Sequence, residues 1–594
     1  MFQDFDTHAD PSQGGDRLNR LRAEMARTGV DGFVVPLSDA HQGEYVAPCD
    51  ARLEWLTGFG GSAGFTVVLA DAAPIFVDGR YTVQVRHQVD LAHFTPVDWP
   101  ATTLPDWLKT QGVRGQIAYD PWLHTVADVE GWARALDGSG IEMVARDNLV
   151  DAIWDDRPAR PAEPIRIQPD AFAGRSHGEK RQALAADLRA AGHAGAIITL
   201  TDAVCWLLNI RGADIPRNPI VHAFAMLNAD ESVDLFTDAP ASDAVRAHLG
   251  AAVRLHPRDA LIAHLEQAEG PVRIDPKTGP AAVQELLQQP VHGPDPCALP
   301  KARKTNAEIE GARAAHLRDG AAMVRFLHWL DGAMADGITE IDAATRLEQE
   351  RRATNALLDL SFNTISSTGP NGAINHYRVT HETNRTLKEG ELFLIDSGGQ
   401  YQDGTTDITR TIPVGAPSDL HRACYTRVLQ GVIALSEARF PRGVAGAHLD
   451  ALARAPLWAA GLDFDHGTGH GVGSYLCVHE GPQRISRASD VPLEPGMILS
   501  NEPGYYRAGD FGIRLENLIV VREAPTLAGQ DARPWLDFET LTFVPFDRRL
   551  IDTSLLTDAE KGWIDTYHRV TQDKIGPLIE GPARDWLDQA CAPL

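Results

Sequence analysis

The sequence has little cysteine, no long apolar run and no block of basic residues. Its six cysteines are scattered over 594 residues without a Cys-x-x-Cys pair, which argues against a disulfide framework and for reduced thiols in the cytosol. No apolar run is long enough to span a bilayer, and the start, MFQDFDTHAD, lacks the apolar region of a secretory signal. The formal net charge of −26 would repel nucleic acid and anionic membranes, so we expect neither as a partner.

What is present is typical of a globular protein with large cores: 43% hydrophobic and 23% charged residues. Two proline-rich stretches, DRPARPAEPIRIQP at residues 156–169 and HGPDPCALPKARK at residues 292–304, have the composition of exposed linkers. They predict three domains, over residues 1–160, 161–304 and 305–594, with a C-terminal extension included in the last.

The first two predicted domains resemble each other. LRAEMARTGVDGFVV at residues 21–35 and LAADLRAAGHAGAII at residues 184–198 each predict an amphipathic helix, a glycine near its end and a short strand. Each is followed by a tryptophan-centred segment that we interpret as a further strand, WLTGFGG at Trp55 and WLLNIRG at Trp206. We therefore predict a duplicated α/β domain, with two unrelated α/β domains as the alternative.

Acidic residues recur in the third domain at the ends of apolar runs. In ELFLIDSGGQYQDGTTDITRTIPV, the apolar run ends in Asp396, a glycine-rich turn follows, and the return strand carries Asp407. The segment ILSNEPGYYRAGDFGIRLENLIVV repeats this pattern with Glu502 and Glu516. Carboxylates brought together by two such hairpins would repel one another unless a cation is bound. Four carboxylates are matched in charge by two divalent ions, which favours a dinuclear site.

Histidines accompany these acids. In DHGTGHGVGSYLCVHEGP, His466 and His470 are four residues apart, but the intervening glycines disfavour a helix and suggest a backbone that passes close to a ligand. One histidine could complete the acid cluster while others, including His376 after the turn in STGPNGAINHYR, serve catalysis. Each residue alone is commonly an ordinary turn or surface residue, and only their joint occurrence in one domain favours a metal site.

Several longer motifs carry a family resemblance: GPNGAINHY, LIDSGGQYQDGTTDITRT, HGTGHGVGSYLCVHEGP and SNEPGYYRAGDFGIRLEN in the third domain, and LTGFGGSAGFTVV, VDGRY and WLLNIRGADIPRNP before it. With these motifs the chain resembles the pita-bread metallopeptidases, and among them the cytosolic, three-domain aminopeptidase P (Xaa-Pro aminopeptidase). The resemblance implies an α/β (α+β) fold: two similar creatinase-like α/β domains followed by a pita-bread catalytic domain.

The resemblance also implies a ligand set. Carried over by motif, the metal ligands are Asp396, Asp407, His470, Glu502 and Glu516. They would hold two divalent ions, Mn²⁺ first, bridged by water or hydroxide. Four carboxylates and one imidazole form a hard donor set that suits Mn²⁺, although ligand type leaves Zn²⁺ and Co²⁺ open.

By the same resemblance, four residues would take part in catalysis, namely His376, His466, His479 and Glu502. Glu502 would shuttle a proton, while His376 and His479 would bind substrate and stabilise the oxyanion or the leaving proline nitrogen. Tyr505 and Arg514 match positions near the family's substrate.

The implied function is hydrolysis of the N-terminal Xaa-Pro bond of peptides by a cytoplasmic enzyme, with a homodimer expected. Prolidase, which cleaves Xaa-Pro dipeptides, is the nearest alternative, although prolidases usually have one N-terminal domain. Methionine aminopeptidase is a weaker alternative, because it lacks the two large N-terminal domains. A non-catalytic binding protein on the same fold is a further alternative, against which the complete ligand set argues.

Overall fold

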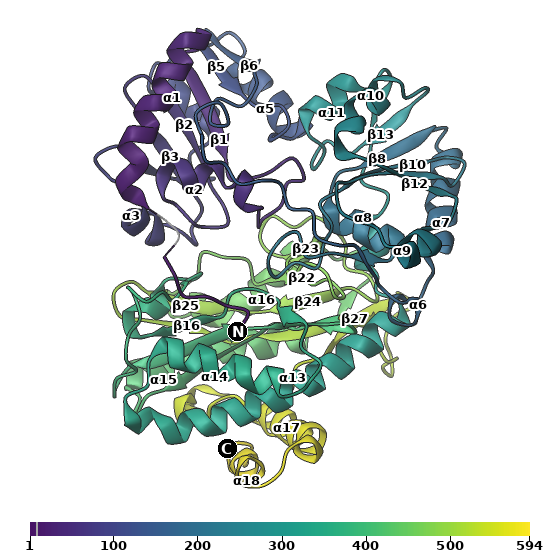
Figure 1. The fold of residues 1–594 in the computed structure, drawn as a ribbon. Helices are drawn as coiled ribbons and strands as arrows, with labels where there is room; N and C mark the ends of the chain where they lie inside the picture. The colour runs from purple at the N-terminus through teal and green to yellow at the C-terminus, as the bar shows by residue number, and fades with distance from the viewer. Residues whose placement is uncertain (8–9) are drawn as a thin grey trace. The chain divides into compact units, whose positions relative to one another are not determined.

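The computed structural model describes residues 1–7 and 10–594, which form two compact units. The C-terminal unit comprises Met1–Thr7, Ala171–Gly174 and Leu299–Leu594. The N-terminal unit comprises residues 10–170 together with Arg175–Ala298 (Figure 1). The domain boundaries expected at residues 160 and 304 remain predictions.

Two sheets of the same design make up the N-terminal unit. The first has the order β4 (Thr95–Asp98), β3 (Pro74–Val77), β2 (Phe65–Leu69), β1 (Gly32–Pro36), β5 (Gly115–Tyr119) and β6 (Ile141–Ala145). The second has the order β12 (Val253–His256), β11 (Val233–Phe236), β10 (Phe224–Asn228), β8 (Gly195–Ile198), β13 (Val272–Ile274) and β14 (Pro290–His292). Corresponding neighbours pair in the same direction, for example β1 antiparallel to β2 and β8 antiparallel to β10. The predicted duplication of an α/β domain is therefore confirmed.

The repeated helices also match, with one correction. The predicted helices are α1 (Gly14–Thr28) and α7 (His177–Ala190), each followed by a glycine at a φ of 72°. Both tryptophans, however, lie in short helices, α2 (Arg52–Thr57) and α8 (Thr201–Leu208), and only the end of the second segment forms a strand, β9 (Ile210–Arg211). Both helices end at a left-handed residue, Gly58 or Asn209. Periodicity cannot separate a short buried helix from a short buried strand, which explains the error.

The C-terminal unit contains a three-stranded and a six-stranded sheet. The first has the order β16 (Ile365–Thr368), β17 (Leu392–Ser397) and β20 (Ile408–Pro413). The second has the order β21 (Phe440–Pro441), β28 (Trp535–Thr540), β27 (Asn517–Glu523), β24 (Ile498–Asn501), β22 (Gly469–Gly471) and β23 (Glu480–Ile485).

Both predicted hairpins are present in these sheets as antiparallel pairs, β17 with β20 and β24 with β27. Each pair is interrupted by a smaller hairpin. One small hairpin is β18 (Gly399–Tyr401) with β19 (Gly404–Thr405), and the other is β25 (Gly504–Arg507) with β26 (Phe511–Arg514). In each case the small hairpin connects the two strands of the main pair.

Long helices accompany these sheets: α13 (Asn306–Ala333), α14 (Glu340–Arg352), α15 (Asp419–Ser436) and α16 (Gly446–Trp458). Helix α13 is capped at its N-terminus by Thr305, whose side chain forms a capping box with Glu308. Figure 1 shows α13 and α14 lying alongside each other in this unit, and the two helices are in contact. Among the described residues, no helix is both long and apolar enough to cross a membrane.

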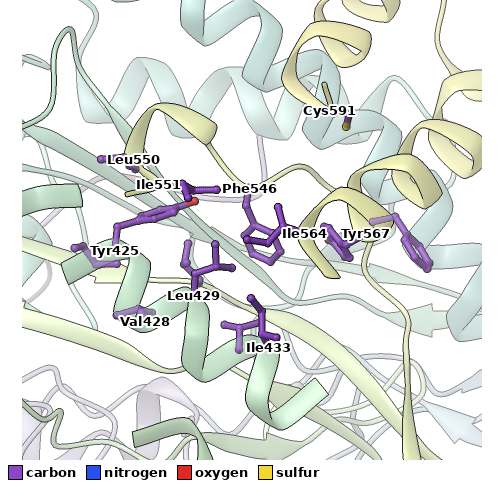
Figure 2. Close-up of a cluster of buried hydrophobic side chains, with 14 of the residues drawn as sticks. Tyr425, Val428, Leu429, Ile433, Phe546, Leu550, Ile551, Ile564, Tyr567 and Cys591 are labelled. Atoms are coloured by element: carbon purple, nitrogen blue, oxygen red, sulfur yellow. The ribbon is translucent and has the colours of Figure 1, made fainter. Parts of the chain in front are cut away.

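The C-terminal extension packs on its own chain. It contains α17 (Asp558–Ile575) and α18 (Pro582–Ala590). Ile564 and Tyr567 of α17 are buried in the same apolar cluster as Val428 and Leu429 of α15, as Figure 2 shows. The extension therefore belongs to the apolar core of the C-terminal unit.

Candidate metal centre

Each main strand pair of the C-terminal unit carries one acid on each arm. Asp396 lies in β17 and Asp407 immediately before β20, whereas Glu502 follows β24 and Glu516 precedes β27. The two pairs meet at Thr409 of β20: its hydroxyl donates to Oε2 of Glu516 (2.9 Å), and its carbonyl accepts from the backbone N–H of Glu516 (3.1 Å). The four acids therefore converge.

His470 of β22 completes the cluster. Its Nε2 lies 3.5 Å from Oδ2 of Asp407 and 3.4 Å from Oε1 of Glu502. Its Nδ1 is 2.9 Å from the carbonyl of Gly471 and must donate the hydrogen, since a carbonyl can only accept. In the neutral imidazole, Nε2 therefore carries the lone pair, and it lies towards the acids, as a metal ligand requires.

A glycine next to His470 allows the backbone to pack closely against a neighbouring strand. A Cβ atom on Gly469 would lie 2.0 Å from the carbonyl oxygen of Ser500 in β24. The hydroxyl of Ser500 in turn accepts from the backbone N–H of His470 (2.9 Å) and donates to Glu502 (3.1 Å). The sequence predicts glycines that let the backbone pass close to a ligand, whereas Gly469 lets it pass close to β24, which places His470 beside the acids.

Burial and crowding disfavour the charged form of these acids. Burial raises the pKa of Asp407 well above its usual range, and the neighbouring charges of Asp396 and Glu502 raise it further. Burial and the charges of Asp407 and Glu502 act in the same direction on the pKa of Glu516. The pKa of Glu502 is also raised, mainly by burial. A bound cation would relieve this repulsion.

The arrangement fits divalent metal ions. Three buried carboxylate oxygens, Oδ1 of Asp396, Oδ1 of Asp407 and Oε1 of Glu516, have no hydrogen-bond partner among the described residues. Asp407, His470 and Glu516 each offer a ligand atom within 4.8 Å of the others. Unpaired buried oxygens are costly, and coordination to a cation would satisfy them.

Arg514 and Tyr506 border the cluster. Arg514 donates from Nη2 to Oδ2 of Asp396 and from Nη1 to the hydroxyl of Tyr506, each at 2.6 Å. The same hydroxyl lies 2.8 Å from Nε2 of His466, whose Nδ1 donates to the carbonyl of Gly467 (2.8 Å). Because that leaves Nε2 as the acceptor, the tyrosine hydroxyl donates to it. Arg514, Tyr506 and His466 therefore form one chain of hydrogen bonds ending at the acids.

The sequence interpretation selected Tyr505 and missed Tyr506. The ring of Tyr505 packs instead against Phe511, with ring centroids 6.1 Å apart. Tyr506 shares a face of the small hairpin with Arg514, since Gly504 pairs with Arg514 and side chains two residues apart lie on one face.

The remaining two histidines lie on neighbouring segments. The ring of His479 is 4.2 Å from that of His470, centroid to centroid. His376 lies on the loop that joins β16 to β17, after the short helix η5 (Gly369–Ala373). This loop packs against β26, because a Cβ atom on Gly512 would lie 1.6 Å from the carbonyl oxygen of Gly372. His376 is thus carried by a loop that touches the hairpin of Arg514.

A second cluster of acids and a histidine lies in the N-terminal unit. Asp39, Asp50 and His222 offer ligand atoms within 4.8 Å of one another. Here, however, Nη1 of Arg258 lies 3.3 Å from Nδ1 of His222, and an arginine can only donate. Nε2 of His222 must then carry the hydrogen, which it donates to Oδ2 of Asp39 (3.0 Å). No lone pair of this imidazole is left for a metal.

Arginines also neutralise Asp50 in that cluster. Arg52 donates to its Oδ1 at 2.9 Å and Arg157 at 3.4 Å. Burial would raise the pKa of Asp39, but the hydrogen bond from His222 and the backbone N–H of Gly43 outweigh it and hold the pKa below its usual range. The cluster is complete without a metal ion.

The fold and the acid cluster of the C-terminal unit are those of a metallopeptidase. Residues 310–523 match the family model of metallopeptidase family M24, and residues 534–594 match the C-terminal region of that peptidase. Residues 17–153 and 156–308 each match the creatinase/prolidase N-terminal domain. The chain belongs to the M24 metallopeptidase family.

Individual relatives are similar in sequence to this chain over nearly its whole length. A probable Xaa-Pro aminopeptidase P of Aspergillus flavus is 40% identical, with 98% of this chain and 92% of the relative covered. A relative of the same description from Laccaria bicolor is 39% identical, with 98% and 93% covered.

Among solved structures, the X-prolyl aminopeptidase of Caenorhabditis elegans, described as a cytosolic enzyme with a di-nuclear active site, superposes with a TM-score of 0.93. It is 34% identical, with 98% of this chain and all of that chain covered. Dipeptidase PepE of Mycobacterium ulcerans superposes with a TM-score of 0.50 at 26% identity, covering 64% of this chain and 98% of its own. These comparisons confirm the family resemblance and the fold class.

Proposed function

We propose that the protein is a metal-dependent aminopeptidase that hydrolyses the N-terminal Xaa-Pro bond of peptides. The observation that carries this proposal is the set of three unpartnered carboxylate oxygens next to a histidine lone pair, in a chain whose relatives are described as Xaa-Pro aminopeptidases. The proposed ligands are Asp396, Asp407, His470, Glu502 and Glu516. They would hold two divalent ions, with Mn²⁺ favoured because the donor set is hard.

When bound, the metal ions would lower the pKa of a water molecule and polarise the scissile carbonyl. The other steps fall to the chain's own side chains. Glu502 would take the proton of the attacking water and deliver it to the leaving proline nitrogen. Its Oε1 accepts a hydrogen bond from the hydroxyl of Ser500, which helps to fix the carboxylate. His376 and His479 would donate hydrogen bonds to the developing oxyanion or hold the leaving group.

Arg514 and Tyr506 would act on the ligand geometry. The guanidinium of Arg514 holds one oxygen of Asp396, which leaves Oδ1 for a metal ion. Tyr506 links that guanidinium to His466. We expect His466 to orient this chain of hydrogen bonds and thereby shape the pocket rather than to touch the scissile bond.

The chemistry of proline explains how an enzyme could select peptides with proline as the second residue. The nitrogen of an Xaa-Pro bond has no hydrogen, and its ring fixes the backbone dihedral φ. An enzyme that needs a hydrogen bond from that nitrogen would reject such substrates, whereas a site that packs the ring would select them. Substrates would therefore be peptides with proline in the second position.

A peptide panel tests this activity. The purified protein is stripped of metal, reloaded with Mn²⁺, and supplied with Xaa-Pro-Xaa peptides, the matching Xaa-Ala-Xaa peptides and Xaa-Pro dipeptides. We expect release of the first residue from Xaa-Pro-Xaa alone. Preferred cleavage of the dipeptide would make the protein a prolidase, and no release from any peptide would contradict the peptidase proposal.

Two further properties belong to the proposal. The Caenorhabditis elegans relative is described as cytosolic, and the six scattered cysteines of this chain, none of which is in a disulfide, suit the same compartment. We also propose that the protein forms a homodimer, which size-exclusion chromatography with light scattering would test. A monomeric mass at micromolar concentration would contradict it.

A further inference from the structure

Glu340, the first residue of α14, is the centre of a buried hydrogen-bond network. Its side chain is fully buried. Oε1 accepts from the backbone N–H of Thr368 (2.7 Å) and from Nδ2 of Asn371 (3.0 Å). Oε2 accepts from the hydroxyl of Tyr377 and the backbone N–H of Arg385, each at 3.0 Å. One carboxylate therefore binds four points along residues 368–385.

The segment that Glu340 holds has little regular structure of its own. All residues between Ala373, the end of η5, and Leu392, the start of β17, are described, and they contain no helix or strand beyond a bridge between Thr339 and Thr386. His376 lies in this stretch, directly before Tyr377. A histidine on an irregular loop needs fixed points nearby to keep its place, because the loop supplies no ladder of backbone hydrogen bonds.

Helix capping does not explain this arrangement. An acid in the first turn of a helix commonly stabilises the helix through its dipole or as a cap. Here Thr339 and Asp342 already form a complete capping box, in which Asp342 accepts from the backbone N–H (2.9 Å) and the hydroxyl (2.7 Å) of Thr339. The carboxylate of Glu340 is directed instead to the loop.

Ion pairing does not explain it either. The donors to Glu340 are backbone N–H groups, an amide and a phenol, all neutral. The guanidinium of Arg385 pairs with Glu391 instead (2.8 Å). Consistent with an environment dominated by burial, the pKa of Glu340 is raised to about 7 although all four donors lower it. A buried acid kept at this cost has a specific role to perform.

We propose that Glu340 is a positioning residue that fixes the loop of residues 368–385 and thereby holds His376 towards the peptide substrate. This inference rests on the proposed function for its kinetic consequence, but the ordering of the loop can be measured without it. Replacing the carboxylate by an amide keeps the shape and introduces two N–H donors where donors already point. At least one of the four hydrogen bonds must then be lost.

The kinetic test is a double-mutant cycle between Glu340→Gln and His376→Ala. We expect E340Q alone to lower kcat about 10- to 100-fold, the range for residues that support a functional side chain, with KM changed less than about twofold. In the His376→Ala background, E340Q should change kcat by less than about twofold, because the residue it positions is gone. Additive losses would show a general structural effect and would overturn the inference.

Glu348 provides a matched control on the same helix. It is also buried and also accepts backbone N–H groups, from Phe2 (2.8 Å) and Gln3 (3.3 Å), but it does not hold the loop. We expect Glu348→Gln to leave kcat within about twofold of the wild type. Should E340Q fold poorly, Tyr377→Phe removes a single donor, and a loss of several-fold that vanishes in the His376→Ala background carries the same meaning.

Hydrogen–deuterium exchange gives a readout that needs no substrate. In E340Q, peptides covering residues 368–385 should exchange about tenfold faster than in the wild type, while E348Q leaves them unchanged. Unaltered exchange in E340Q would overturn the inference even if activity fell. If instead the metal-loaded wild type cleaves no peptide while E340Q loosens the loop, the proposed function fails and the structural role of Glu340 stands.

Discussion

The two units of the molecule each bury acids beside a histidine, and they neutralise them differently. Around Asp39 and Asp50 the chain supplies its own cations, Arg52, Arg157 and Arg258. In the C-terminal unit, four carboxylates share one guanidinium, that of Arg514. The pKa shifts follow this difference: that of Asp39 is lowered, while those of Asp407 and Glu516 are raised.

The comparison shows how to separate a structural acid cluster from a metal centre when both place ligand atoms within the same few ångströms. Proximity does not discriminate, since both groups satisfy it. The orientation of the imidazole does: Nε2 of His470 offers a lone pair, whereas Nε2 of His222 donates a hydrogen. Unsatisfied carboxylate oxygens discriminate as well, and they occur at Asp396, Asp407 and Glu516.

The largest expected difference between the clusters is in metal binding. Asp407→Asn should lower kcat/KM to below about a thousandth of the wild type, at least about 4 kcal/mol, and should reduce the bound metal. Asp39→Asn should leave the metal-to-protein ratio unchanged. Elemental analysis beside peptide hydrolysis measures both. A loss of metal in the Asp39 variant would mean that the N-terminal cluster also binds an ion.

In the N-terminal cluster, replacing an acid should lower the stability of the fold. Asp39→Ala removes the acceptor for the backbone N–H groups of His41 and Gly43 and for the side chain of His222. We expect the free energy of unfolding to fall by about 3 kcal/mol, because three hydrogen bonds to a charged acceptor are lost and their buried donors are left without a partner. Urea denaturation of the metal-free protein measures it, with the exposed Asp71→Ala as a control that should change it by less than about 0.5 kcal/mol. A loss below about 1 kcal/mol would contradict the structural role.

Much of this architecture follows from sequence patterns. Apolar runs that end in Asp396 or Glu502, each followed by a turn and a return strand with a second acid, predicted both strand pairs and the pairing of Asp396 with Asp407 and of Glu502 with Glu516. The helix–glycine–strand pattern predicted the duplicated domain. These features depend on local periodicity and turn chemistry, which a single chain displays directly.

Other features depend on contacts far apart in sequence. The small inserted hairpins, the selection of Tyr506 rather than Tyr505, and the link from Glu340 to residues 368–385 all require knowledge of which segments pack together. The role of Glu340 joins residues 28 to 45 positions apart in the chain. No pattern within α14 distinguishes it from Glu348. Likewise, the choice between His470 and its neighbouring histidines came from family resemblance, because spacing alone left it open.

Glu340 lies between the two kinds of acid compared above. Both of its oxygens are hydrogen-bonded, whereas among the described residues the C-terminal cluster has three unpartnered carboxylate oxygens, but all four donors to Glu340 are neutral, unlike the arginines of the N-terminal cluster. Burial raises its pKa to about 7, so between pH 4.5 and 7 the folded protein binds a proton that the unfolded chain does not. The resulting stability is complete below the unfolded value and is lost as the pH rises through 7. We expect the wild type to gain on the order of 2 kcal/mol over E340Q when the pH falls from 8 to 5.

Urea denaturation of both proteins at each pH measures this difference. The hydroxyl of Tyr377 faces the carboxylate, and burial raises the pKa of that hydroxyl further above this range, so it adds no slope. A difference that does not vary with pH would indicate that the four donors keep Glu340 ionised throughout.

The smallest predicted effect is a gain in stability when an acid of the C-terminal cluster is replaced, whereas replacing Asp39 in the N-terminal cluster should destabilise the fold. Glu516→Gln removes a charge from a crowded group of acids and keeps an acceptor for the hydroxyl of Thr409. In the presence of a chelator, we expect this variant to be more stable than the wild type by on the order of 1 kcal/mol, about 2 °C in Tm, because repulsion is relieved. With Mn²⁺ added, the wild type should gain more than the variant, since binding to the folded state stabilises it. Thermal unfolding with and without chelator gives all four values. If the variant has a lower Tm than the wild type in the presence of the chelator, Glu516 is, like Asp39, an acid that the fold itself requires. The electrostatic argument for a metal centre would then be wrong.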